Sequence, residues 1–151
     1  MTISVEVIGA LLCDVAPALD LEAVVHHGPA AEWDLVFPDE RLVEVVWQAD
    51  TGLLVLETAL GIPQDSDAAA LHTLLLQYNQ LWRDTGGLRM ALNGVDGGVQ
   101  LGFCLSAAAA DVNLLVNVVG NFHAAANAWS ERLRQAVVPA ADGMMASFLR
   151  V

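Results

Sequence analysis

The first fifteen residues place their apolar side chains at the spacing of a helix. Apolar residues recur three and four positions apart from Ile3 to Val15, and Pro17 follows directly. This spacing predicts an amphipathic helix that ends before the proline. The β-branched residues in the segment leave a strand as the alternative.

Three segments with a period of two follow, and they predict an antiparallel meander. Short turns rich in Pro, Asp and Gly separate the segments, which are residues 32–37, 41–48 and 53–60. Alternating side chains bounded by such turns are typical of strands joined in hairpins. The preceding stretch, residues 20–31, leaves the start of the first strand open.

Helical spacing returns after residues 65–67, whose Asp and Ser side chains suit a helix N-terminus. A hairpin over 88–105 and a long helix over 108–135 complete the chain. The predicted order is α-βββ-α-ββ-α. Because almost all strand connections are short hairpins, we expect an α+β fold in which helices pack on a largely antiparallel, twisted sheet. We expect one domain over 1–138 and a C-terminal tail over 139–151 that either docks or is flexible.

Charge excludes several classes of partner. Eighteen Asp and Glu face six basic residues, all Arg, which gives a net charge of −12. Such a chain repels nucleic acid and anionic membranes. No apolar stretch is long and uninterrupted enough to span a bilayer, and the N-terminus lacks the basic start of a signal peptide.

Candidate catalytic and metal-binding residues form no recognisable constellation. Cys13 and Cys104 are far apart in sequence, and His26 and His27 would point to opposite faces of a strand. The chain has no Lys, so the glycines of residues 94–98 indicate a turn and not a phosphate-binding loop. We therefore expect no catalysis, no metal and no cofactor.

The chain has more apolar surface than a small domain easily hides. Hydrophobic residues make up 56% of it, and the mean hydropathy is +0.51. The surplus falls on the predicted strands 41–48 and 53–60, which carry apolar side chains on both faces. This second face is covered by a dimer partner or the first helix, or it forms a groove for an apolar peptide.

Several of these segments resemble the class I type III secretion chaperones, the Tir chaperone (CesT-like) family. The resemblance covers about residues 1–135. It rests on the run 53–56 leading into Leu60-Gly61-Ile62-Pro63, the leucine cluster before Asn79, the hairpin 88–105, and Phe122, Trp129 and Leu133 of the last helix.

The resemblance implies a homodimer that binds the N-terminal chaperone-binding segment of a secreted effector. The segment would wrap around the dimer in extended form and stay soluble and secretion-competent. The family acts in the bacterial cytoplasm, in virulence, without ATP or metal.

The family pattern also implies site residues. The first helix and first strands would supply effector-binding side chains, here Leu11, Leu12, Trp33, Leu35, Phe37, Val45 and Trp47. The second helix and the following strand would supply the dimer interface, here Leu74, Leu75, Tyr78, Trp82, Leu88 and Met90. Any of these large apolar residues could instead be core.

Three other functions remain open from the sequence. One is a YbjN-like regulatory or sensory protein-binding domain of the same fold. The second is an enzyme with an unrecognised site, and the third is an assembly subunit without a client.

Overall fold

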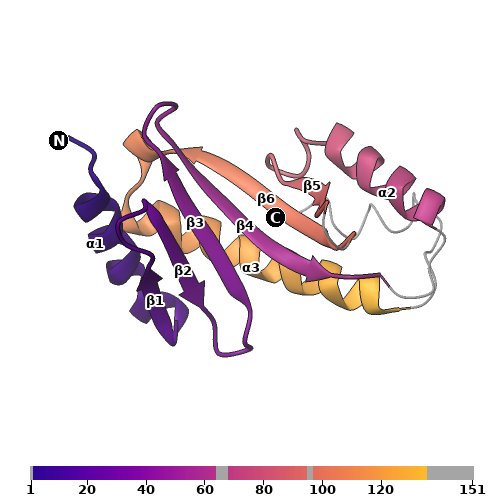
Figure 1. Cartoon of the computed structure of the whole chain (residues 1–151), viewed down its shortest axis with the longest axis horizontal. Helices are drawn as coiled ribbons and strands as arrows, with labels where there is room; N and C mark the ends of the chain where they lie inside the picture. The colour runs from indigo at the N-terminus through magenta and orange to yellow at the C-terminus, as the bar shows by residue number, and fades with distance from the viewer. Residues whose placement is uncertain (1, 64–67, 95–96, 136–151) are drawn as a thin grey trace. The chain divides into compact units, whose positions relative to one another are not determined.

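The computed structural model describes residues 2–63, 68–94 and 97–135, and it has the predicted order of elements with one strand added (Figure 1). The helices are α1 (Val5–Val15), α2 (Ala68–Gln80) and α3 (Val112–Arg134), with short 3-10 turns η1 (Ala16–Leu19) and η2 (Ala107–Ala109). The strands are β1 (Ala23–His26), β2 (Glu32–Val36), β3 (Leu42–Gln48), β4 (Leu53–Gly61), β5 (Arg89–Leu92) and β6 (Val99–Ser106). They form one sheet in the order β1-β2-β3-β4-β6-β5. The α+β class with a largely antiparallel sheet is confirmed.

Helix α1 settles the choice left open by the first segment. The Ser4 side chain accepts a hydrogen bond from the Val7 amide at 3.3 Å, as an N-cap does. The helix buries Ile8, Leu12 and Val15 and ends where Pro17 enters η1. The helical prediction is therefore confirmed, and the strand alternative is wrong.

Strand β1 is the element that the sequence pattern missed. It pairs antiparallel with β2, with Val25 opposite Asp34 and His26 opposite Trp33. It has only four residues, and their exposure does not alternate between buried and exposed. Its extended conformation depends on pairing with β2, which a local pattern does not reveal.

The chain forms two compact units. The first unit comprises Met1–Thr58 and Cys104–His123, and the second comprises Ala59–Phe103 and the chain from Ala124 on. Because β4, β6 and α3 each continue from one unit into the other, we propose that both belong to a single domain. The predicted tail 139–151 lies outside the described residues.

One face of strands β2–β4 carries the core of the first unit. Alternate side chains such as Trp33, Leu35 and Val43 are at most 2% exposed. Each large side chain buried in this way contributes roughly 1.5–3 kcal/mol. Helix α1 lies on this face, since a Cβ at Gly9 would be 3.4 Å from the indole nitrogen of Trp33. Helix α3 lies on it too, because the His123 ring stacks on the Phe37 ring.

The core of the second unit is built on α2. Leu71, Leu74, Leu75 and Tyr78 form its buried stripe. The Asn79 side chain takes the place of a neighbouring strand for β5: its amide donates to the Met90 carbonyl, and its carbonyl accepts from the Met90 amide at 2.6 Å. This pairing gives a structural reason for the asparagine that follows the leucine cluster.

Candidate functional site

Most of the predicted effector-binding side chains lie in the core of the first unit. Leu12, Trp33, Leu35, Phe37 and Val45 are at most 3% exposed. Leu11 and Trp47 are half-buried. In this conformation a client can reach only Leu11 and Trp47 of the predicted set.

The predicted dimer-interface residues divide in a similar way. Leu74, Leu75, Tyr78, Leu88 and Met90 are at most 5% exposed and pack in the core of the second unit. Trp82, just after α2, is 51% exposed, and the Arg83 guanidinium lies 4.5 Å from its ring centroid. Two further apolar side chains of the second unit, Leu76 and Leu92, are 69% and 44% exposed. Both were absent from the prediction, although Leu76 stands off the apolar stripe of α2 and so could have been found.

The other face of the first unit's strands, which we call the open face, carries a row of carboxylates. Asp34 of β2 lies opposite Glu44 of β3, and Glu44 lies opposite Glu57 of β4. Like charges placed directly across neighbouring strands repel one another. We call these three residues the acidic ladder. The His27 ring is hydrogen-bonded to Asp34, at 2.5 Å, at one end of the ladder.

Apolar side chains flank the acidic ladder on the open face. Val36 lies opposite Leu42 on one side of it, and Val46 lies opposite Val55 on the other. Val25 and Leu42 are 43% and 40% exposed. The open face therefore offers acidic and apolar contacts side by side. The sequence predicted this second face of the strands to be apolar, and the acidic ladder shows that it is apolar only in part.

Burial raises the pKa of Glu44, and the charges of Asp34, Glu57 and Glu32 raise it further. A raised pKa in the folded state means that the fold favours the protonated form of Glu44. The contribution of Glu44 to the free energy of unfolding is therefore highest at low pH and falls as the pH rises through the folded pKa of Glu44. Glu44→Gln is therefore expected to stabilise the protein at pH 7, by roughly 0.2–1 kcal/mol for a like-charge contact removed. The gain should vanish near pH 4. Thermal unfolding at both pH values measures it.

Glu6→Gln is the control with the opposite sign. Backbone and Ser4 hydrogen bonds lower the pKa of Glu6 in the first turn of α1. The carboxylate of Glu6 therefore favours folding above its unfolded pKa, and its removal should lower the melting temperature at pH 7. If both variants changed the melting temperature at pH 7 in the same direction and by the same amount, the causes given for the two pKa shifts would be wrong.

Tyr78 packs edge-on against Trp129, with ring centroids 5.1 Å apart. Burial raises the pKa of Tyr78 to about 12. Its contribution to stability is complete below the unfolded pKa of about 10 and is lost as the pH rises towards 12, up to roughly 2–3 kcal/mol. Because Tyr78 is the only tyrosine in the chain, absorbance at 295 nm isolates its titration. We expect a midpoint near 12 in the folded protein and near 10 in urea; equal midpoints would show that the phenol is accessible.

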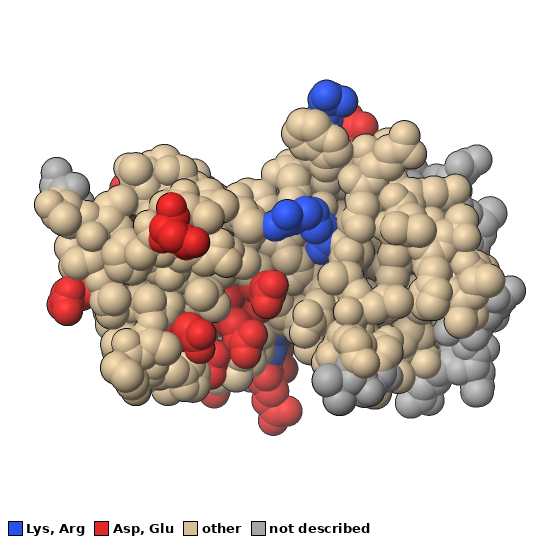
Figure 2. Space-filling model, turned by 45° about the horizontal axis from the view of Figure 1, so that its top comes forward, with Lys and Arg blue, Asp and Glu red and all other residues tan. Residues whose placement is uncertain are grey.

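Charge is distributed unequally between the two units. The first unit contains 12 of the 18 acidic residues and one Arg, a net charge of −11, and the second contains six acidic residues and five Arg, a net charge of −1. Figure 2 shows acidic side chains gathered over the first unit, whereas the visible face of the second unit is mostly uncharged. Basic partners are thus attracted to the first unit, and two copies of the second unit repel each other little.

The described residues show no arrangement of His, Cys, Asp and Glu that could hold a metal ion. Within the same ranges, no helix is both long and apolar enough to cross a bilayer. The two cysteines are free thiols, and Cys13 is exposed.

Comparison with known proteins identifies the family. Residues 32–130 match the model of the Tir chaperone protein (CesT) family. The chain belongs to that family. The matched region begins with β2 and ends within α3, so it includes the acidic ladder, Trp82 and the Asn79 pairing. The resemblance read from the sequence is therefore confirmed, whereas no curated protein matches the chain.

Solved structures share the fold of this Tir chaperone family member at low sequence identity. A chain of the ExsC–ExsE complex matches with a TM-score of 0.75 and 20% identity, over 90% of this chain and 100% of that one. A chain of the HopA1–SchA chaperone–effector complex matches with a TM-score of 0.65 and 13% identity, over 86% and 99%. The third is from the complex of the Yersinia pestis type III secretion chaperone SycH with a fragment of YscM2, with a TM-score of 0.61 and 20% identity over 80% and 98%.

Proposed function

We propose that this protein is a type III secretion chaperone. It binds the N-terminal chaperone-binding segment of a secreted effector and keeps that segment soluble and secretion-competent in the bacterial cytoplasm, without catalysis. The match of residues 32–130 to the Tir chaperone family carries this proposal. The fold supports it, since chains from a chaperone–effector complex and from a chaperone bound to a protein fragment share it.

The open face and the outer edge of β1 are the proposed client surface. The His27 amide donates to the Glu32 carbonyl, so the backbone groups of Val24 and His26 alternate with it and point away from β2. An end strand of this kind can accept an extended segment as a further strand. The apolar residues of the open face would hold aliphatic side chains of the client, and the acidic ladder would hold its Lys or Arg.

The second unit carries the proposed dimer interface. Its exposed apolar residues, Leu76, Trp82 and Leu92, are accessible to a second copy. With a net charge of −1, two copies of the second unit can contact each other with little repulsion. Two copies of the first unit, each with a net charge of −11, would repel each other. Leu74, Leu75, Tyr78, Leu88 and Met90 support this surface from within and contact a partner only if the core rearranges.

Co-expression with candidate effectors tests the function. The effector's N-terminal region should be insoluble alone and should be recovered in solution together with this protein, with no nucleotide added. A truncated effector without that region should not co-purify. The proposal would be contradicted if the truncated effector co-purified with this protein, or if no effector of the same bacterium did.

A further inference from the structure

A cleft in the first unit lies outside both proposed surfaces. It has a volume of about 460 Å³, within the range of about 300–1,000 Å³ typical of small-ligand pockets. Leu19, Phe37 and Pro38 give it an apolar wall. Gly120 of α3 leaves room in it, because this residue has no side chain.

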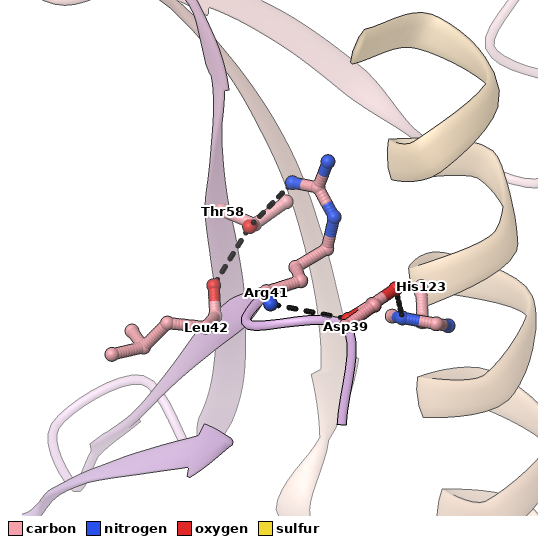
Figure 3. A network of polar contacts seen from close by, with 5 residues as sticks. All are labelled: Asp39, Arg41, Leu42, Thr58 and His123. Atoms are coloured by element: carbon pink, nitrogen blue, oxygen red, sulfur yellow. Dashed lines mark hydrogen bonds and ion pairs between the residues drawn. The ribbon is translucent and has the colours of Figure 1, made fainter. Parts of the chain in front are cut away.

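A network of hydrogen bonds fixes one carboxylate of the cleft in place (Figure 3). Asp39 accepts from the Arg41 amide at 3.1 Å through Oδ1 and binds His123 Nε2 at 2.7 Å through Oδ2. The Arg41 guanidinium donates to Thr58 Oγ1, and that hydroxyl donates to the Leu42 carbonyl. The turn that carries Asp39 is thus tied to β3, β4 and α3. Because a carboxylate oxygen can accept more than one hydrogen bond, a ligand can share Asp39 with these partners.

A second carboxylate lines the same cleft. Asp20 caps η1 in the left-handed conformation, with φ of 53°. Its carboxylate has no hydrogen-bond or ion-pair partner among the described residues. Asp20 and Asp39 therefore place two carboxylates beside an apolar wall, in a unit whose net charge is −11. The His123 ring, which binds Asp39, belongs to the same lining.

We propose that this cleft binds an arginine side chain of the client, an inference that rests on the proposed chaperone function. The aliphatic part of arginine would lie along Leu19 and Phe37, and the guanidinium would donate to Asp20 and Asp39. Arginine fits better than lysine because its planar group makes paired hydrogen bonds with carboxylates and sheds water more readily. A phosphate or other anion would be repelled by the same charges.

Titration of the full chain with N-acetyl-arginine amide tests the cleft without knowledge of the client. NMR should show saturable shifts of the backbone amides of Leu19, Asp20, Phe37, Asp39 and Gly120. The N-acetyl-citrulline amide, which has the same shape without the charge, should not produce them. Asp20→Asn and Asp39→Asn should each weaken binding about 3- to 10-fold, as expected for the loss of one charge-assisted contact.

Glu40→Gln and Gly120→Leu are the control variants for this titration. Glu40→Gln removes the same charge one residue from Asp39 but outside the lining, and it should change binding less than twofold. Asp20→Asn should fold normally because Asn tolerates the left-handed conformation at least as well as Asp. Gly120→Leu should fill the cleft and abolish the shifts.

Three results would overturn the inference: equal binding of citrulline, shifts confined to other regions, or equal effects of Asp39→Asn and Glu40→Gln. If the arginine probe fails while an effector still co-purifies, the cleft assignment fails and the chaperone function stands. If the probe binds and no effector co-purifies, the proposed function fails instead.

Discussion

Trp82→Asp is expected to convert the proposed dimer into a monomer, with a dissociation constant raised more than about 100-fold. Exposed tryptophans at interfaces often contribute about 2 kcal/mol or more, and a buried unpaired carboxylate adds a further penalty. Trp82 is half-exposed and follows α2, so the substitution leaves the core of the second unit intact. Light scattering across a range of concentrations measures the change in mass, and circular dichroism confirms the fold.

Leu42→Asp is the matched control for that experiment. Leu42 is an exposed apolar residue of the first unit, similar in accessibility to Trp82. It should leave the mass of the dimer unchanged and weaken client binding. Dimers that persist in Trp82→Asp, or that dissociate equally in both variants, would place the interface elsewhere.

The double variant Glu44→Lys/Glu57→Lys is expected to bind a basic effector segment at least about 100-fold more weakly. Two positive charges would replace two rungs of the acidic ladder and face the client's own Lys or Arg, a contact that costs several kcal/mol. The fold should be retained, because Glu44→Lys turns the repulsion with Asp34 into an attraction. The two introduced positive charges lie opposite each other and repel as Glu44 and Glu57 do, so that contact is no worse than before. Titration calorimetry at two salt concentrations would measure the affinity of the variant and its salt dependence.

Glu40→Lys/Asp50→Lys is the control of equal charge. Both double variants raise the net charge from −12 to −8, but Glu40 and Asp50 lie in turns outside the ladder. If only the total charge mattered, the two variants would lose affinity equally. We expect the control to lose less than about threefold in affinity, since Glu40 and Asp50 are exposed charges outside the ladder and salt screens such charges.

Elements with a strong period were predictable from the sequence. Helix α1, the three strands over 32–60 and the hairpin over 88–105 all follow their apolar spacing. Strand β1 was not predictable, because four residues at the end of a sheet adopt their conformation through pairing with β2. The predicted cap at 65–67 lies outside the described residues.

The candidate site was harder to predict than the fold, for a physical reason. Apolar spacing identifies large side chains but does not distinguish a core residue from a binding residue. The family pattern, which implied Leu35 and Val45 as client-binding residues, does not distinguish them either, and both are buried. The acidic ladder depends on the register of three strands, which sets Asp34, Glu44 and Glu57 side by side. Turn lengths and alternation together could have suggested that register. The cleft could not have been found, because Asp20, Asp39 and His123 come from three distant segments.

The mass of the purified complex with an effector's N-terminal segment shows whether this protein holds a client as a dimer. Light scattering should give two chains of 16.0 kDa for one effector segment, and the free protein should have the mass of two chains. A protein that remains a monomer and retains no effector segment under the same conditions would contradict both the proposed dimer and the proposed chaperone function.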